Sequence, residues 1–371
     1  MTLPLIEPRL RRNLDRLLLL SMLLLFGISM STIYFASGSP KTAIRQGVYF
    51  TIGLLLMGYV AAQDYGKLAR FGNLFYWGNV LLLLVVKLFV PKINGAARWI
   101  PLPIPGMDVK LQPSEFVKIV IILTLSVYVV RIGTRIREFP YLLRTLAHIA
   151  LPVGLIMWQP DLGTGLVVVV IWAGIVFLAG ADWRHMIGLA VAGLALFGIG
   201  WQTGLVKDYQ KDRVITLLNP MHDPRGDGYH VLHSMRAIGG GQVTGQGFGK
   251  GVQTNGGFIP ENHTDFVFTA LGEEAGFVGA CVLLTVYALF LWRGLAIMAD
   301  SEDPLGRLIA GGVVTLFTFH ILVNIGMTTG IMPVVGVPLP LVSFGGSAVW
   351  ANLCAIGLLL SISMRRHKIQ F

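Results

Sequence analysis

The stretch "PENHTDFVFTALGEE" (260–274) gathers acidic and polar residues in a chain that is otherwise rich in apolar segments. Asp265 stands just before an apolar run, where a carboxylate has the chemistry of a general base. The helix dipole also favours an acidic residue at such a position, so catalysis and simple helix stabilisation are both open at this point. Glu273 and Glu274 lie two turns deeper and are expected to line a cavity or to form paired charges.

Three further charged residues fall at the edges of apolar runs. "QPSEFVKI" places Glu115 and Lys118 three residues apart, hence on one helical face, and "QPDLGTG" places Asp161 in a tight turn. Charged side chains inside membrane segments are costly and face the protein interior or a water-filled cavity. A buried network that only fixes helix packing is one interpretation. A cavity for polar substrate is the other, and it is favoured because burying ions gains little stability.

The glycine-rich part of the segment 204–265 does not predict a nucleotide site. It lacks the G-x-x-x-x-G-K-[ST] spacing, and no strand precedes it. Its glycines lie near Arg213, Arg236 and Lys250, so backbone amides and cations there could approach a phosphate; a tightly turned loop with solvated charges is the equal alternative. The histidines at 222, 230, 233 and 263 have no spacing typical of zinc.

The composition predicts an all-α, polytopic membrane protein. Of the 371 residues 54% are hydrophobic and only 13% are charged, against about 25% charged residues in soluble domains. Apolar runs long enough to cross a hydrocarbon core of about 30 Å recur along the chain. They predict about ten transmembrane helices, at 17–36, 47–62, 71–90, 114–130, 146–158, 164–179, 186–201, 266–292, 308–327 and 348–363.

Basic residues gather before the first predicted span and after the last. Because Lys and Arg concentrate on the cytoplasmic side of membrane proteins, both termini are expected in the cytoplasm. One large extracytoplasmic loop, about 202–265, then joins the seventh and eighth helices, and the loops 91–112 and 330–347 share its face. Proline and glycine concentrate in these loops, which predicts shaped segments at the membrane surface, not extra helices. We expect one domain, 1–371, whose net charge of +10 reflects this bias and not nucleic-acid binding.

Five motifs occur in the order found in one bacterial family. "QPSEFVKI", "QPDLGTG", "GYHVLHSMRAIGGGQVTGQGFGKG", "PENHTDFVFTALGEEAGFVG" and "GVPLPLVSFGGS" resemble those of the SEDS proteins (shape, elongation, division, sporulation). "DPRGDGYH" and "GVPLPLVSFGGS" are more similar to the elongation members than to the division members. The chain departs mildly from the pattern, with Asn262 where Arg is more usual and "SFGGS" where Tyr is usual.

The resemblance implies a peptidoglycan glycosyltransferase of the bacterial cytoplasmic (inner) membrane. It would polymerise lipid II onto a lipid-linked glycan, with a class B penicillin-binding protein, the elongation transpeptidase, as its partner. The aspartate of the "HTDF" motif, here Asp265, is the family's catalytic residue. The family's Glu, Lys and Asp of the other motifs correspond to Glu115, Lys118 and Asp161.

The expected reaction places Asp265 as general base on the acceptor hydroxyl, with inversion at the donor sugar. Arg98, Lys118, Arg213 or a divalent cation, Mg²⁺ or Mn²⁺, would stabilise the pyrophosphate leaving group, and His263 is expected in the same charge network. No organic cofactor is expected. Two rival hypotheses are a lipid II flippase, for which neither repeated halves nor paired broken helices are found, and a scaffold that does not need Asp265.

Overall fold

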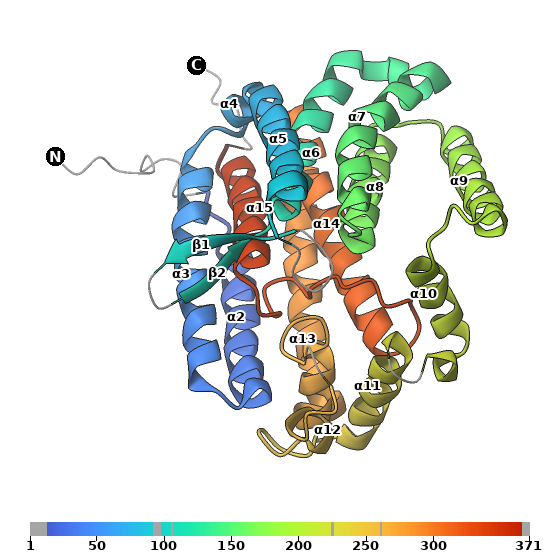
Figure 1. Ribbon diagram of the computed structural model, residues 1–371. Coiled ribbons are helices and arrows are strands. Elements are labelled where there is room, and N and C mark those ends of the chain that lie inside the picture. The colour runs from blue at the N-terminus through green and yellow to red at the C-terminus, as the bar shows by residue number, and fades with distance from the viewer. Residues whose placement is uncertain (1–12, 92–97, 105–106, 224–225, 260–261, 366–371) are drawn as a thin grey trace.

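The computed structural model describes residues 13–91, 98–104, 107–223, 226–259 and 262–365. In this part of the chain ten helices correspond to the ten predicted spans. Nine are long and apolar enough to cross a membrane, and α8, with 17 residues, is the shorter tenth. The prediction of an all-α, multi-pass membrane protein is therefore confirmed (Figure 1). The ten are α2 (Arg16–Ser37), α3 (Pro40–Ala62), α5 (Gly72–Phe89), α6 (Pro113–Ile132), α7 (Phe139–Trp158), α8 (Leu162–Leu178), α9 (Trp183–Thr203), α13 (Val267–Asp300), α14 (Pro304–Thr328) and α15 (Gly346–Arg365).

The fifth span begins earlier than predicted. α7 starts directly after Glu138 with a proline in its first turn, whereas the prediction began at residue 146. Arg144 precedes the predicted start, but it lies on the helix, exposed, with its guanidinium carbon 4.9 Å from the ring of Tyr141. A long basic side chain can lie along an apolar surface and keep its charge outside, so Arg144 does not end the helix.

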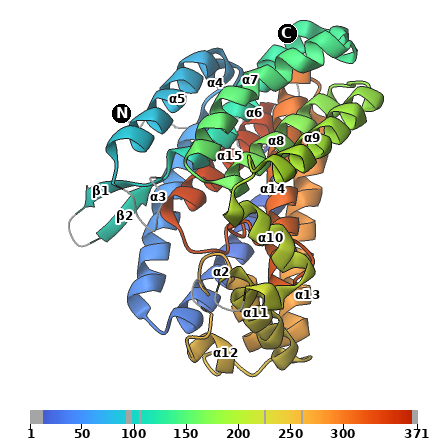
Figure 2. The ribbon, with the colours of Figure 1, turned by 45° about the vertical axis from the view of Figure 1, so that its right-hand side comes forward.

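The centre of the bundle is formed by α14 and α15. In their most apolar 18 residues, 72% of α14 and 89% of α15 are buried. Small residues allow close packing of such helices: a Cβ at Gly53 of α3 would lie 2.4 Å from the side chain of Leu353 of α15. In contrast, α9 stands at the edge of the bundle (Figures 1 and 2), and Gly200 is its one buried residue.

The predicted eighth span, 266–292, is two helical arms. α13 breaks at Gly276, where φ is +64° and ψ is −161°. A Cβ at Gly279 would come within 3.9 Å of the side chain of Leu271, eight residues earlier. In a straight helix eight residues advance about 12 Å, so the arms 267–275 and 277–300 fold back toward each other.

The glycine-rich loop 242–251 satisfies the backbone groups freed by this break. The N–H groups of Gln246 and Gly247 donate to the carbonyls of Glu273 and Glu274 at 2.9 and 3.0 Å. A Cβ at Gly245, whose φ is +82°, would lie 2.0 Å from the Glu274 carbonyl oxygen, so the loop can approach this closely only with glycine there. Packing against the broken helix therefore accounts for the glycine at 245.

The expectation of no further helices is wrong for the segment 202–265, whereas the described parts of 91–112 and 330–345 contain none. The segment 202–265 contains α10 (Asp208–Leu218), α11 (Asp227–Gly241) and the short α12 (Val252–Asn255), because its prolines and glycines fall mainly between these helices. The segment 91–112 contains two antiparallel strands, β1 (Ile100–Ile104) and β2 (Met107–Leu111), with Ile100 opposite Leu111. The remaining short elements are α4 (Tyr65–Arg70), η1 (Gly133–Arg137) and η2 (Pro220–His222).

The side of the membrane on which these loops lie stays a prediction. It depends in part on the basic residues at 9–12 and 366–368, which fall outside the described residues. The start of α2 and the end of α15 lie together, because the hydroxyl of Ser363 donates to the carbonyl of Asn13 at 3.1 Å. Figure 1 shows the strands and α10–α12 away from the end of the bundle where α15 ends.

Candidate active site

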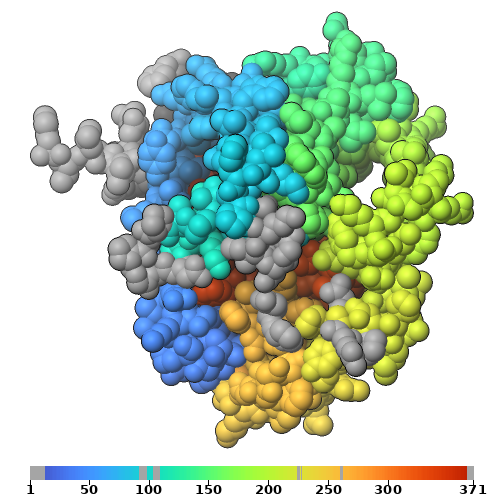
Figure 3. Space-filling view, viewed as in Figure 1, coloured from blue at the N-terminus to red at the C-terminus, as the bar shows by residue number. Residues whose placement is uncertain are grey.

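A cavity of about 550 Å³ lies where α3, α6, α8 and the start of α15 meet β2 and α10. Figure 3 shows the surface hollowed at mid-height, where part of the red C-terminal region is visible at depth. Five of the predicted site residues line the cavity, although they come from separate parts of the chain: Arg98, Glu115, Asp161, Arg213 and Asp265. Other lining residues are Arg45, Tyr49, Lys110, Gln112, Thr164, Gly336, Pro338, Phe344 and Ser347.

The backbone around Asp265 is tied to the loop 333–345, here called the C-terminal loop, and to α14. Three successive carbonyl groups, those of residues 263–265, accept hydrogen bonds. The first accepts from the N–H of Phe344 at 2.9 Å and the second from the hydroxyl of Ser343 at 2.5 Å. The third accepts from the side-chain amide of Asn324 at 2.8 Å. Asp265 is thus fixed by its main chain just before α13 begins.

The Asp265 carboxylate lies over Gly336 of the C-terminal loop. A Cβ built on Gly336 would be 3.4 Å from Asp265 Oδ2, and the backbone there has φ +67°, a conformation that favours glycine. The absence of a side chain keeps this face of the carboxylate open to the cavity. A general base needs such room, because its substrate hydroxyl must come within about 2.6–3.2 Å.

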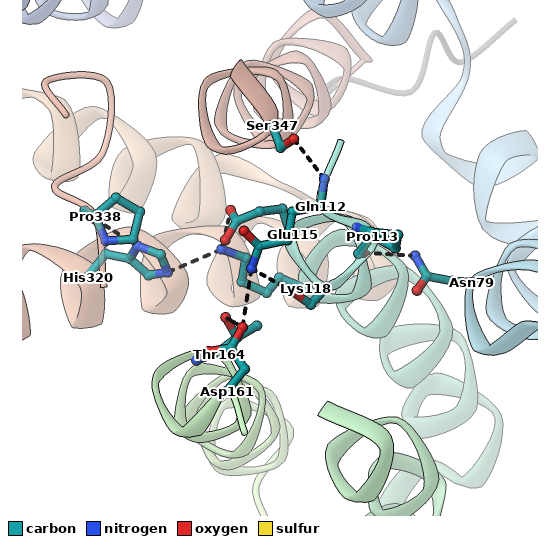
Figure 4. Close-up of polar contacts among 11 residues, drawn as sticks. Asn79, Gln112, Pro113, Glu115, Lys118, Asp161, Thr164, His320, Pro338 and Ser347 are labelled. Atoms are coloured by element: carbon teal, nitrogen blue, oxygen red, sulfur yellow. Dashed lines mark hydrogen bonds and ion pairs between the residues drawn. The ribbon is translucent and has the colours of Figure 1, made fainter. Parts of the chain in front are cut away.

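Glu115 and Lys118 form an ion pair at the floor of the cavity. Lys118 Nζ is 2.7 Å from Glu115 Oε2, one turn along α6 as their spacing predicted, and both residues are buried. Lys118 does not line the cavity, but it lies directly behind Glu115, which does. His320 of α14 lies on its other side, with Nε2 3.5 Å from the ammonium (Figure 4).

Asp161 both caps a helix and lines the cavity. Its carboxylate accepts from the backbone N–H and the hydroxyl of Thr164 at 3.2 and 3.0 Å, so it is the N-cap of α8. It also accepts from Gln112 Nε2 at 3.2 Å, and Arg98 Nη1 lies 4.0 Å away. Arg98 donates in addition to the carbonyls of Gln159 and Pro160. Asp161 therefore has a structural role at the start of α8 and also a place in the cavity wall.

Sequence reasoning missed two cations of the cavity, Arg45 and Lys110. Arg45 comes from α3 and Lys110 from β2. Both fall on the face predicted to be extracytoplasmic, where Lys and Arg are less common than on the cytoplasmic face. Basic residues at these unusual positions could have been recognised as candidates for the site. Among the described lining residues there are four basic side chains, at 45, 98, 110 and 213, and three acidic ones, at 115, 161 and 265. The basic excess suits an anionic ligand.

Glu273 and Glu274 do not line the cavity; they hold the loops below it. The Glu273 carboxylate accepts from the N–H groups of Gln253 and Thr254 at 2.7 and 2.8 Å and from the Thr254 hydroxyl at 2.6 Å. Glu274 Oε1 accepts from the N–H of Gly249 at 3.1 Å. Amides of the glycine-rich loop are therefore bound to the broken helix, and of the cations near that loop only Arg213 is among the described residues lining the cavity.

His263 lies beside the cavity and not in its wall. Its Nδ1 is 3.0 Å from the amide oxygen of Asn262, and its ring centroid is 5.5 Å from that of Phe344. In the described part of the chain no three His, Cys, Asp or Glu side chains come together as a metal site. Glu115, Asp161 and Asp265 are the carboxylates among the described lining residues, and a carboxylate can share a cation with a phosphate ligand.

The chain matches known proteins along nearly its whole length. The family model described as cell cycle protein (FtsW, RodA, SpoVE) matches residues 10–368. The peptidoglycan glycosyltransferase MrdB of Escherichia coli K12 is 39% identical over 362 residues, 96% of this chain and 95% of that protein. The peptidoglycan glycosyltransferase RodA of Treponema pallidum is 34% identical, over 95% of this chain and 98% of that protein.

Two solved structures have the same fold. One, described as structural coordination of polymerization and crosslinking by a peptidoglycan synthase complex, is 31% identical and has a TM-score of 0.82, with 96% of this chain and 99% of that chain covered. The other is the rod shape determining protein RodA of Thermus thermophilus, 29% identical, with a TM-score of 0.71 and coverage of 96% and 98%. The resemblance predicted from the five motifs is confirmed: the chain belongs to the FtsW/RodA/SpoVE family, the SEDS proteins.

Proposed function

We propose that the chain is a peptidoglycan glycosyltransferase that polymerises lipid II into glycan strands during cell elongation. The observation that carries the proposal is the cavity in which Asp265 faces a basic excess of side chains. Relatives named MrdB and RodA support the elongation role, and an FtsW at 33% identity keeps the division role as the alternative. Both roles use the same chemistry.

Asp265 acts as the general base. It takes the proton from the acceptor hydroxyl of lipid II as that oxygen attacks the anomeric carbon of the lipid-linked glycan. The bond from that carbon to the pyrophosphate oxygen breaks, so an α-linked donor gives a β-linked product without a covalent intermediate. A positioned base is typically worth about 10²–10⁴-fold in rate. The proton then passes from Asp265 to solvent.

The basic residues of the cavity stabilise the leaving pyrophosphate. Negative charge develops on that group as the bond breaks, and cations already in position stabilise it without having to reorganise. Arg98 and Arg213 were expected in this role, and Arg45 and Lys110 join them in the wall of the cavity. Lys118 serves indirectly, because it lies behind Glu115.

A divalent cation, Mg²⁺ or Mn²⁺, fits this cavity when the substrate supplies most of its ligands. Mg²⁺ sites commonly use one or two carboxylates together with substrate phosphates. Asp265 would hold the cation with pyrophosphate oxygens. When bound, the cation would neutralise charge on the leaving group.

The protein works in the bacterial cytoplasmic membrane, with its termini in the cytoplasm and its cavity on the extracytoplasmic side. Lipid II and the lipid-linked glycan are both amphiphiles, which an enzyme embedded in the membrane can bind from the bilayer. A class B penicillin-binding protein is its partner. The similarity to a peptidoglycan synthase complex that coordinates polymerization and crosslinking supports this partnership.

The test compares the wild type with Asp265→Asn, each purified with the cognate penicillin-binding protein and supplied with lipid II and Mg²⁺. Glycan products are separated on a gel. Asp212→Asn, the same change at an exposed aspartate of α10, is the matched control. We expect polymer from the wild type and the control and none from a folded Asp265→Asn.

Polymer from Asp265→Asn at the wild-type rate would refute the general-base role. No polymer from any of the three proteins, together with translocation of lipid II in liposomes, would identify a flippase instead. If neither polymerisation nor translocation is observed, the scaffold hypothesis remains.

A further inference from the structure

His320 of α14 holds the buried charge pair from behind. Its Nε2 lies 3.5 Å from Lys118 Nζ, a long hydrogen bond, and its Nδ1 lies 3.2 Å from the carbonyl oxygen of Pro338. His320 and Lys118 are each 1% exposed. Pro338 belongs to the C-terminal loop and lines the cavity (Figure 4). The imidazole thus bridges α6 and the loop that lies under Asp265.

The contacts assign each ring nitrogen its role. A carbonyl oxygen only accepts, so the Nδ1 of His320 carries a proton and donates to Pro338. An ammonium only donates, so Nε2 is the unprotonated nitrogen and accepts from Lys118. A buried ammonium needs more than one acceptor, and Lys118 finds one in Glu115 and a second in His320.

Asn324 lies one turn further along α14 and also binds the C-terminal loop. Its side-chain amide donates to the carbonyl of Val337 at 2.8 Å and to that of Asp265 at 2.8 Å. His320 and Asn324 therefore hold two successive carbonyls of the C-terminal loop, those of residues 337 and 338. Asn324 also bonds to the carbonyl of Asp265, and His320 also contacts Lys118 of the ion pair.

We propose that His320 is a positioning residue for the glycosyl transfer. It keeps the Lys118 ammonium in place behind Glu115, so that Glu115 faces the substrate in the cavity as an ionised carboxylate. Its bond to Pro338 holds the proton on Nδ1 and so leaves Nε2 as the acceptor for Lys118. The proposal rests on the proposed function, since it assigns His320 a part in that reaction.

Two conservative substitutions separate the two contacts of the imidazole. In His320→Gln the amide oxygen reaches about where Nε2 lies and can accept from Lys118, but the bond to Pro338 is lost. In His320→Asn the amide reaches about where Nδ1 lies and can donate to Pro338, but it is too short for Lys118. We expect His320→Asn to lower kcat about ten- to a hundredfold, the effect of one lost hydrogen bond to a charged group. KM for lipid II should stay within about twofold, and His320→Gln should recover most of kcat.

The same pair of variants can refute the proposal. If His320 only anchors the loop, His320→Asn will retain activity and His320→Gln will lose it; equal losses in both would also overturn the role toward Lys118. His148→Asn is the matched control, because this histidine of α7 bonds Thr124 and does not line the cavity. Thermal unfolding in detergent verifies that each variant is folded.

A spectroscopic test does not depend on catalysis. In ¹⁵N-histidine-labelled protein in bilayers, the signal that disappears in His320→Gln should show a protonated Nδ1 and an unprotonated Nε2, and Lys118→Met should shift its Nε2. A protonated Nε2, or no shift in Lys118→Met, would overturn the proposal. A wild type that makes no glycan would refute the proposed function, while this measurement would still decide the contact between His320 and Lys118.

Discussion

Replacing Gly336 by alanine would place a methyl group against the Asp265 carboxylate. The methyl carbon would lie 3.4 Å from Asp265 Oδ2, at a backbone φ of +67°. The chain offers a matched control in Gly257, whose φ is +72° and where an added Cβ would meet nothing within 4 Å. Gly336→Ala and Gly257→Ala therefore share the backbone strain, and they differ in the contact with the carboxylate.

The strain sets the expected loss of stability. A residue with a Cβ in the left-handed region costs about 1–2 kcal/mol, so both variants should lose about that much free energy of unfolding. A contact of 3.4 Å is an ordinary van der Waals distance, so Asp265 need not move. The methyl group instead blocks one approach to Oδ2. We expect kcat to fall about ten- to a hundredfold, less than the roughly 10²–10⁴-fold that a general base can contribute.

Thermal unfolding in detergent and lipid II polymerisation with the partner protein would be measured for both variants. The reasoning predicts similar losses of stability, with the loss of activity confined to Gly336→Ala. Equal activity in the two variants would show that the room above Gly336 is not used in the reaction. An equal loss of activity in both would show that the backbone strain alone is responsible.

Three further predictions follow from the site and its supports. Arg45→Gln and Lys110→Gln should each lower kcat/KM about tenfold or more, because each removes a cation of the cavity. Lys41→Gln, a change at an exposed residue of α3, should leave kcat/KM unchanged. Equal kcat/KM values for the three variants and the wild type in a steady-state assay would contradict this. Glu273→Ala removes three hydrogen bonds to a buried carboxylate and should lower the free energy of unfolding by about 3 kcal/mol or more; an unchanged unfolding temperature would argue against that role. Chelation by EDTA should stop polymerisation and added Mg²⁺ or Mn²⁺ restore it, and polymerisation that survives chelation would exclude the cation.

Much of the architecture could be predicted because a bilayer imposes simple requirements on sequence. Ten apolar runs correspond to ten helices, since each had to satisfy its backbone groups within itself. Charged residues at the ends of these runs were informative for the same reason. Glu115, Asp161 and Asp265 are 150 residues apart at their extremes, from 115 to 265, yet they line one cavity.

The break in α13 could not be read from the sequence. Its apolar run continues through Gly276, and a single glycine in a membrane helix is common. What permits the break is the loop 242–251, whose amides and carbonyls take the hydrogen bonds that the helix loses. These hydrogen bonds join segments about 30 residues apart, and no periodic pattern in the sequence marks them. A prediction based on helical periodicity therefore could not include them. The role of Glu273 was not predicted either, because its partners, Gln253 and Thr254, lie about 20 residues earlier, in α12.

The supporting residues of the site escaped detection for a related reason. His320 and Asn324 are polar residues within an apolar helix, which marks them as noteworthy but does not indicate what they contact. Their partners are backbone carbonyls of the C-terminal loop, and every residue type has such a carbonyl, so the sequence does not identify them.

The residues that line the cavity come from nearly the whole length of the chain, so the cavity can form only late in synthesis. Its wall joins Arg45, near the beginning, to Ala348, near the end, and the carbonyls of residues 263–265 are held by Asn324, Ser343 and Phe344. A nascent chain that has inserted its first eight helices has the aspartate but not its supports. The cavity closes only when the last two helices and the loop between them are in place. Incompletely inserted chains are therefore inert, and a polymerising centre arises only in a finished protein.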